Sequence, residues 1–330
     1  MRQVINIQNV IYRCFAGIKM LYPLALGQQS GSSFHRSIKE FCTMSLSDTI
    51  VQYILSGLTI GSIYALVALG YNIIYNTTGI INFAQGEFLM LGGMFMAACC
   101  NIYHLPLPVG ALISIGLVVI IGLLIERIAI RPVKDANIVT LIIITIGVSI
   151  FIKACAAFVT KDSFTFQSFP GPDYIKISTA TLSVQSLWIM GVASIIMICL
   201  SIFFRRTVMG KAMRACSINR EAAHIVGIDV DRMSLLSFGL SALMGAVAGI
   251  MVTPTTQISW NRGTELGLKG FCAVILGGLG SGPGAILGGI SLGLLETFGN
   301  IVFSGYKDAI AFSILLIVLY LRPQGIIGRG

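Results

Sequence analysis

Charged residues are scarce in this chain of 330 residues, of which Asp, Glu, Lys and Arg make up only 11%. A soluble protein carries about 25%, so most of this surface cannot face water. Hydrophobic residues make up 55% of the chain, and mean hydropathy is +0.88. Apolar stretches of about 20 residues recur, and each is long enough to cross a bilayer core of about 30 Å as a helix. The composition excludes an ordinary soluble domain and predicts an all-α integral membrane protein, a polytopic helical bundle.

Acidic residues are fewer than basic ones, 13 Asp and Glu against 22 Lys and Arg, and the formal net charge is +9. In membrane proteins Lys and Arg collect in cytoplasmic loops, which explains a basic balance without any nucleic-acid partner. The sequence has no basic stripe with interleaved aromatic residues. Nucleic-acid binding is therefore not expected.

The sequence also lacks the patterns of a metal centre, a disulfide framework and a nucleotide site. Its 8 cysteines contain no C-x-x-C pair, and most lie in or beside apolar stretches, where cysteine behaves as a small hydrophobe. The glycine-rich stretch 277–284 lacks the Lys-Ser/Thr pair that a Walker A loop requires. No Ser/His/Asp or Cys/His set is recognisable. We therefore expect no metal, no cofactor, no enzymatic activity and no ATP hydrolysis on this chain.

Eight apolar segments are predicted to span the membrane, or 8–10 if broken helices are counted separately. Their approximate bounds are 50–75, 80–100, 107–126, 138–159, 185–204, 233–254, 267–303 and 307–321. Residues 1–45 hold only short apolar runs, interrupted by Arg13 and Lys19, so we expect a poorly structured extension there, with Met44 as an alternative start. Residues 46–330 form the predicted transmembrane domain.

The seventh segment is too long for one simple crossing. It is interrupted by residues that do not sustain a regular helix without tertiary support, namely Gly277, Gly278, Gly280, Gly282, Pro283 and Gly284. We predict two half-helices joined by an irregular turn. The turn is expected inside the bundle, because non-helical backbone at membrane depth is buried in protein or lines a wet cavity. The first segment is a second candidate for a break, near Tyr75–Gly79.

The charges of the connecting loops predict the orientation. Residues 205–232 carry a basic excess, and so does the stretch 126–134, two crossings earlier. The loops 161–184 and 255–266 are balanced in charge. Since basic loops stay inside, the first two are predicted to be cytoplasmic and the last two external.

The basic loop contains a pattern that predicts a short helix with a glycine stop. Glu221, Ala222 and Ala223 are followed after three residues by Gly227, and Arg214 precedes them. Such a helix can project into the cytoplasm as a knob for a partner's groove. On the pattern alone, an ordinary charged amphipathic connector is an equally good interpretation.

Three polar side chains, Asn82, Gln85 and Glu87, fall at the start of the second apolar segment. Polar groups at membrane depth face the bundle interior or a cavity, so they predict either a pathway lining or hydrogen bonds between helices. The stretches 79–86 and 277–284 are both interrupted by glycine, one in each half of the chain. Such a pair points to a transporter's central site, although close helix packing through small residues explains it equally well.

Two isolated charged residues in apolar segments are expected to have structural rather than functional roles. We expect Lys153 to snorkel toward the interface and Glu296 to end a half-helix, and neither is taken as a proton relay.

The Glu221–Gly227 pattern in a basic loop resembles the EAA loop of ABC importer permeases. Further segments resemble the LivH-type permease of branched-chain amino-acid importers, in the expected order and spacing, over residue 46 to the C-terminus: 79–87, 126–132, 277–284 and 321–326. As a set these motifs are highly specific. The first 45 residues have no counterpart in that family.

The resemblance implies a multi-pass permease in the bacterial inner membrane, surrounded by lipid, that translocates leucine, isoleucine, valine or a related amino acid. It further implies a second homologous permease subunit, two cytoplasmic ATPase subunits that dock at Arg214, Glu221, Ala222, Ala223 and Gly227, and a periplasmic substrate-binding protein. The alternatives are an ABC permease for another small solute such as urea or an amide, and a stand-alone channel or secondary carrier. The last would need intramembrane ion pairs or a selectivity filter and would have no use for the basic loop.

Overall fold

The computed structural model describes residues 46–133, 136–172, 174–177 and 180–302, together with residues 312, 313, 316–318, 320, 322 and 324–327. From Ile50 onward the chain forms one compact unit. The predicted extension at residues 1–45 and most of the predicted eighth span lie outside the described residues.

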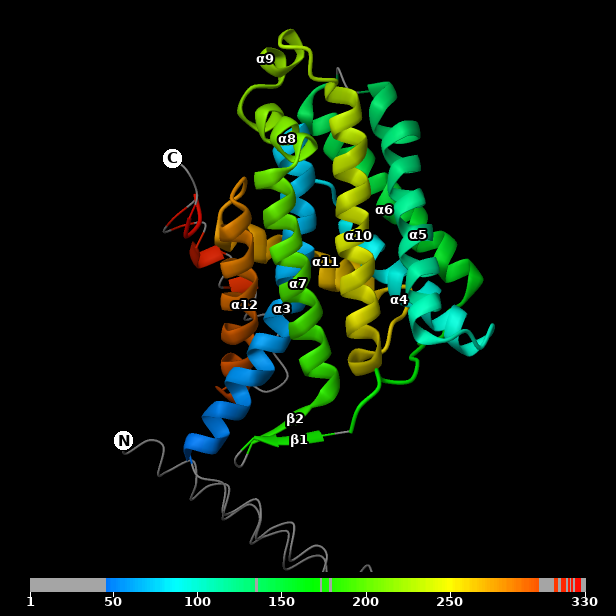
Figure 1. Cartoon of the computed structure of the whole chain (residues 1–330), viewed down its shortest axis with the longest axis vertical. Coiled ribbons are helices and arrows are strands. Elements are labelled where there is room, and N and C mark those ends of the chain that lie inside the picture. Colours follow the sequence, from blue (N-terminus) through cyan, green and yellow to red (C-terminus); the bar gives the residue numbers. More distant parts are fainter. Residues whose placement is uncertain are drawn as a thin grey trace, which may run out of the picture. The chain divides into compact units, whose positions relative to one another are not determined.

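Helices make up nearly all of this unit (Figure 1). Their bounds are α3 Leu46–Thr78, α4 Gln85–Asn101, α5 Leu107–Ile125, α6 Ile138–Val159, α7 Val184–Arg206, α8 Val208–Ile218, α9 Arg220–Ile225, α10 Val230–Thr256, α11 Arg262–Gly277 and α12 Gly282–Val302. A π-helical turn, η2 Glu126–Ile130, and a 3-10 turn, η3 Arg131–Val133, follow α5. The all-helical membrane class is as predicted, with one small addition, an antiparallel hairpin of β1 Tyr174–Ile177 and β2 Ala180–Ser183.

Six of the eight predicted spans are found in the part of the chain that the structure describes. Five helices there are long and apolar enough to cross a membrane, or six if the bent pair α11 and α12 counts as one. The eighth predicted span lies mostly outside the described residues, and the second is shorter than predicted, because helix α4 has only 17 residues, about 25 Å at 1.5 Å per residue. The stretch before it, 79–84, is irregular yet largely buried. Helix α3 itself continues unbroken to Thr78 and stops where Gly79 takes a φ of 74°.

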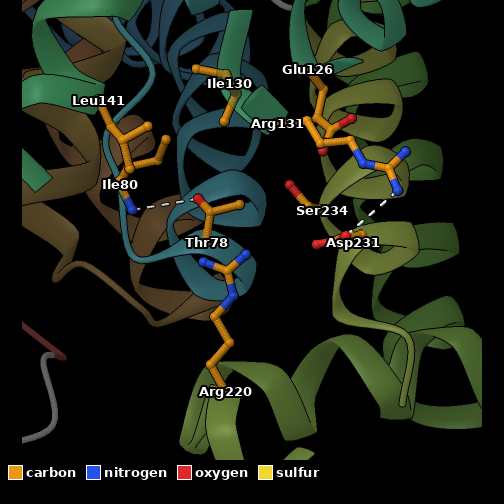
Figure 2. Close-up of a pocket in the computed structure, with 9 residues that line it drawn as sticks. All are labelled: Thr78, Ile80, Glu126, Ile130, Arg131, Leu141, Arg220, Asp231 and Ser234. Carbon is orange, nitrogen blue, oxygen red and sulfur yellow. Dashed lines mark hydrogen bonds and ion pairs between the residues drawn. The ribbon is translucent and has the colours of Figure 1, made fainter. Parts of the chain in front are cut away.

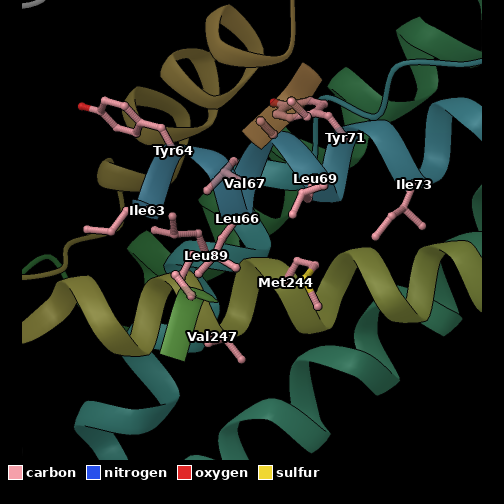
Figure 3. Packing of buried hydrophobic residues seen from close by; sticks show 14 of the residues in the cluster. Ile63, Tyr64, Leu66, Val67, Leu69, Tyr71, Ile73, Leu89, Met244 and Val247 are labelled. Carbon is pink, nitrogen blue, oxygen red and sulfur yellow. The ribbon is translucent and has the colours of Figure 1, made fainter. Parts of the chain in front are cut away.

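The core forms where α3, α4 and α10 pack together. Figure 3 shows Leu66 and Leu69 of α3 against Leu89 of α4 and Met244 of α10. Small residues allow α4 and α10 to approach closely: a Cβ at Gly249 would collide with the carbonyl oxygen of Leu89, and one at Gly92 with the backbone of Ala246. In a bilayer, where lipid is as apolar as the helices, such close packing is a main source of association energy.

The predicted break in the seventh segment is present, because α11 and α12 meet at an angle of 119°. Gly278 and Gly280, with φ values of 103° and 88°, form the turn, and Asn72 of α3 accepts a hydrogen bond from the Gly280 amide at 2.8 Å. The turn is buried at Gly277, Gly278 and Gly284 but exposed at Gly280 and Pro283. It is thus only partly enclosed, since its tip reaches the surface of the bundle.

A buried ion pair joins the two arms of this bend. Lys269 of α11 lies 2.8 Å from Glu296 of α12, and the hydroxyl of Tyr64 in α3 donates to the other carboxylate oxygen at 2.7 Å. The expectation that Glu296 ends a half-helix is wrong, because α12 continues to Val302. Glu296 instead holds three helices together.

The loops gather at opposite ends of the bundle in the grouping that their charges predict. Arg131 of η3 lies 3.5 Å from Asp231 of α10, which brings the two basic loops together at what we call the α8–α9 end. At the other end, the hairpin end, Phe164 and Ile258 exchange two backbone hydrogen bonds of 2.8 Å and so join the two balanced loops. Figure 1 shows α8 and α9 at one extremity and β1–β2 at the other.

Candidate translocation and coupling sites

A cavity of about 300 Å³ lies in the bundle between α3, α4, α6 and α11. Gly86, Ser149, Lys153, Gly263, Thr264 and Gly267 line one part of it. The other part is apolar and aromatic, formed by Tyr71, Phe83, Ile146, Ile150 and Leu268. Its volume is at the lower end of the roughly 300–1,000 Å³ found for small-molecule pockets.

Glu87 lies directly behind the polar part of this cavity and is fully buried. Its Oε1 accepts hydrogen bonds from the hydroxyls of Ser149 at 3.0 Å and Thr264 at 3.1 Å. Its Oε2 lies beside Gly263, where a Cβ would collide with it, and has no hydrogen-bond donor within the part of the chain that the structure describes. A buried charge with one unsatisfied oxygen is expensive in an apolar medium, so Glu87 is the candidate for a functional group among the three predicted polar residues.

Gln85 and Asn82 make contacts of a different kind. Gln85 donates to the Ser241 carbonyl at 3.1 Å and its Oε1 accepts from the Ser241 hydroxyl, which binds α4 to α10. Asn82 accepts from the Ala84 amide at 3.1 Å and thereby shapes the entry into α4. Neither residue lines the cavity.

Two helices begin at the cavity wall. The first turns of α4 and α11 touch through glycine, because a Cβ at Gly86 would collide with the carbonyl oxygen of Gly263 and with the Cα of Gly267. The close approach of these glycines therefore brings the first turns of the two helices together at the cavity wall.

The glycine turn lies elsewhere. Residues 277–284 line neither of the cavities described here. Gly277 and Gly284 press their backbones together, with no room for a Cβ on either, whereas a Cβ at Gly282 would meet open space. The C-terminal stretch is hydrogen-bonded to this region, since the amides of Ile326 and Ile327 donate to the carbonyls of Leu276 and Gly277 at 2.9 and 3.1 Å.

A second, smaller cavity lies at the α8–α9 end. Figure 2 shows its wall: Arg220 extends from α9 toward Thr78 at the end of α3, and Arg131 turns toward Asp231. Glu126 of η2 faces the same space, is 2% exposed, and has one carboxylate oxygen without a hydrogen bond among the described residues. Arg220 of α9 therefore lines this small cavity together with the ends of α3 and α6, two of the helices that line the central cavity.

The predicted short helix in the basic loop is present as α9, followed by Gly227 at a φ of 93°. Asn219 caps its start by accepting from the Ala222 amide at 2.9 Å, and Ala223 is buried against the bundle. Arg214, Glu221 and Ala222 are exposed. Large apolar side chains are also exposed around α9: Ile218 at 85%, Ile225 at 83% and Val226 at 81%. These side chains lie outside the helices that face lipid, and exposed apolar patches in such a place are typical of docking surfaces.

Ser149, Thr264 and Lys153 are the cavity residues that the sequence interpretation missed. Lys153 does not snorkel freely: its Nζ donates to Thr264 at 3.4 Å and lies 5.4 Å from the ring centre of Trp260. A lone lysine in an apolar helix was the available signal, because an ionisable residue at membrane depth is a candidate functional group by default. Ser149 and Thr264 carried no signal, since hydroxyls are ordinary in transmembrane helices.

Comparison with known proteins identifies the family. The description "Branched-chain amino acid transport system / permease component" matches residues 53–319, which is well over half of the chain. The chain belongs to this permease family. The high-affinity branched-chain amino acid transport system permease BraD of Pseudomonas aeruginosa is 35% identical over 294 residues, 84% of this chain and 96% of that protein. LivH of Escherichia coli K12 is 36% identical over 297 residues with the same coverage, and the E. coli galactofuranose transporter permease YtfT is 26% identical over 255 residues, 76% of this chain and 69% of that protein.

As a member of this permease family, the chain is a multi-pass inner-membrane transport protein. The sequence segments that resemble the LivH-type permease lie close to one another in the fold: 79–87 beside 126–132, and 321–326 beside 277–284. Ile80 lines the small cavity with Glu126 and Arg131, and Ile326 is hydrogen-bonded to the end of α11.

Proposed function

We propose that this permease translocates branched-chain amino acids inward as a membrane subunit of an ATP-binding-cassette importer. The observation that carries the proposal is the identity of 35 and 36%, over 84% of the chain, to permeases named for high-affinity branched-chain amino acid transport. The largely apolar wall of the central cavity is consistent with an aliphatic solute.

The partners in this proposal are a second homologous permease subunit, two cytoplasmic ATPase subunits and a periplasmic binding protein. We assign ATPase docking to α8 and α9, on the basis of the exposed apolar side chains there and of Arg214 and Glu221 among them. Because Arg220 extends from α9 to the end of α3, a movement of the docked ATPase has a direct path to the helices around the central cavity.

Uptake of labelled leucine into vesicles tests the transport function. We expect concentrative uptake only when the ATPases, the second permease and ATP are present together. Concentrative uptake by this chain alone would overturn the proposal in favour of a secondary carrier. Uptake of urea or an amide without uptake of leucine, isoleucine or valine would overturn the substrate assignment.

The variant Glu221→Arg tests the docking assignment. Reversing the charge on exposed α9 is expected to abolish co-purification of the ATPase subunits, while membrane insertion of the permease stays normal. Asp162→Arg provides the matched control, because Asp162 is equally exposed but lies in the loop at the hairpin end. Normal ATPase co-purification with Glu221→Arg would contradict the assignment.

A further inference from the structure

Two opposite charges lie at the polar part of the central cavity, Lys153 in its lining and Glu87 behind it, and one hydroxyl separates them. Glu87 accepts from the Thr264 hydroxyl at 3.1 Å, and the oxygen of that hydroxyl accepts from Lys153 at 3.4 Å. The carboxylate and the ammonium group are thus held side by side without direct contact between them.

Neither charge is fully compensated by this arrangement. Two hydroxyls saturate Oε1 of Glu87, but Oε2 has no donor among the described residues, although the side chain is 0% exposed. Lys153 donates to one hydroxyl and lies over one aromatic ring, and the residue is half-buried at the cavity. Charges at membrane depth require partners, so this site favours a ligand that brings one cation and one anion.

The apolar part of the cavity wall selects for a different property. Phe83, Ile146, Ile150 and Leu268 present apolar surface to a space of about 300 Å³. A ligand that fills the cavity therefore has a compact doubly charged end and an uncharged, apolar end. An α-amino acid has this form, because its ammonium and carboxylate groups share one carbon atom.

We propose that this cavity is a binding site for the zwitterionic end of the transported amino acid, with Glu87 attracting the ammonium group from behind the Ser149 and Thr264 hydroxyls, Lys153 holding the carboxylate, and the apolar wall receiving the side chain. The proposal rests on the proposed function for the class of solute and adds where and how it binds. A ligand with only one of the two charges leaves a protein charge without its partner.

The test uses the assembled transporter in nanodiscs without binding protein, so that selection by the binding protein does not enter. In a background lacking reactive cysteines, Leu268→Cys places a thiol on the cavity wall, and its labelling rate by a maleimide is measured. We expect millimolar leucine to slow labelling at least threefold. The acid 4-methylpentanoate and the amine 3-methylbutylamine, which each keep the side chain but lose one charge, are expected to give no protection.

Variants of Glu87 and Lys153 then test whether each charge is needed for leucine binding. Glu87→Gln retains an oxygen that accepts from Ser149 and Thr264, so the fold is expected to persist, yet protection by leucine should disappear. Lys153→Met should abolish it as well. Asp162→Asn and Lys161→Met, exposed at the hairpin end, serve as matched controls and should leave protection unchanged. If either site variant fails to assemble, the proposal is still tested by comparing protection by leucine, 4-methylpentanoate and 3-methylbutylamine in the transporter that keeps Glu87 and Lys153.

Equal protection by all three compounds, or full protection by leucine in Glu87→Gln, would overturn the proposal. So would a Leu268→Cys transporter that takes up leucine while leucine leaves its introduced thiol unprotected. Failure of the proposed function has a separate signature: vesicles then take up no branched-chain amino acid, while zwitterions with other side chains still protect the cavity.

Discussion

Buried polar residues at the start of α4 have different tasks although they are close neighbours in the sequence. Gln85 satisfies groups on α10, whereas Glu87 supports the cavity wall. The sequence pattern left pathway lining and interhelical bonding as alternatives for both. The choice depends on which helix faces each side chain, and this is a property of the packed bundle rather than of α4.

Replacing Gln85 should therefore affect stability and not solute selection. Gln85→Leu removes the side-chain donor to the Ser241 carbonyl and leaves the Ser241 hydroxyl with the Gly70 carbonyl alone, which costs about 1–3 kcal/mol. We expect a lower midpoint of thermal unfolding in detergent and an unchanged apparent KM for leucine once transporter amounts are equalised. A raised KM at normal thermal stability would place Gln85 in the pathway instead.

Gly249 is a second residue whose role is steric. The variant Gly249→Ala puts a methyl group onto the Leu89 carbonyl oxygen, and overpacking of this kind costs about 1–3 kcal/mol. The expected result is a clear fall in unfolding temperature. Gly147→Ala in α6 is the matched control, because a Cβ there meets nothing within 4 Å; it should leave stability unchanged or slightly raised.

At the scale of elements, the bend between α11 and α12 depends on the buried pair Lys269–Glu296. Removing one partner of a buried ion pair leaves an uncompensated charge and costs about 3–5 kcal/mol. Lys269→Met is therefore expected to reduce the yield of folded permease severely. Adding Glu296→Gln, which still accepts from Tyr64, should restore much of it, as measured by size-exclusion profiles and thermal unfolding.

The partly exposed pair Arg262–Glu265 gives the contrast for that experiment. Its atoms are also 2.8 Å apart, but both side chains are about one-third exposed, so its loss should cost at most about 1 kcal/mol. If Lys269→Met were no worse than Arg262→Met, the buried pair would not be what holds the bend.

The break between α11 and α12 was predictable, because a run of glycines and a proline does not sustain a regular helix without tertiary support. The bend angle and the ion pair were not, since Lys269 and Glu296 are 27 residues apart and meet only after the turn has formed. The length of α4 was overestimated for a similar reason: hydropathy continues through 79–84, but the backbone there is irregular. Helix α9 was predicted with its glycine stop because capping is local chemistry.

At the scale of the whole molecule, the two pairs of loops assign opposite faces of the membrane. We predict that a single cysteine at exposed Ser217 in α8 reacts with an impermeant maleimide only in inside-out vesicles. A single cysteine at Asp162 should react only in right-side-out vesicles. The reverse pattern at both sites would invert the orientation inferred from the basic loops.

A companion variant keeps the native neighbour of Ser217, Cys216, as its single cysteine. Burial raises the pKa of the Cys216 thiol, so less of it is thiolate at neutral pH and its labelling should be slow. Because the folded-state pKa is raised, labelling of Cys216 should accelerate as the pH increases above neutral, whereas the exposed Ser217→Cys thiol should already react rapidly. Equal rates at pH 7 would show that α8 lifts away from the bundle.

The backbone bonds from Ile326 and Ile327 to the end of α11 set an order of events during synthesis. Both carbonyls in this contact are made long before the two amides that satisfy them. While the ribosome is still translating α12, the glycine turn therefore lacks two of its hydrogen bonds. Maturation of this bend must await the emergence of residues 326–327 from the ribosome, so a permease stalled before that point would be inserted yet incompletely folded, and open to membrane proteases.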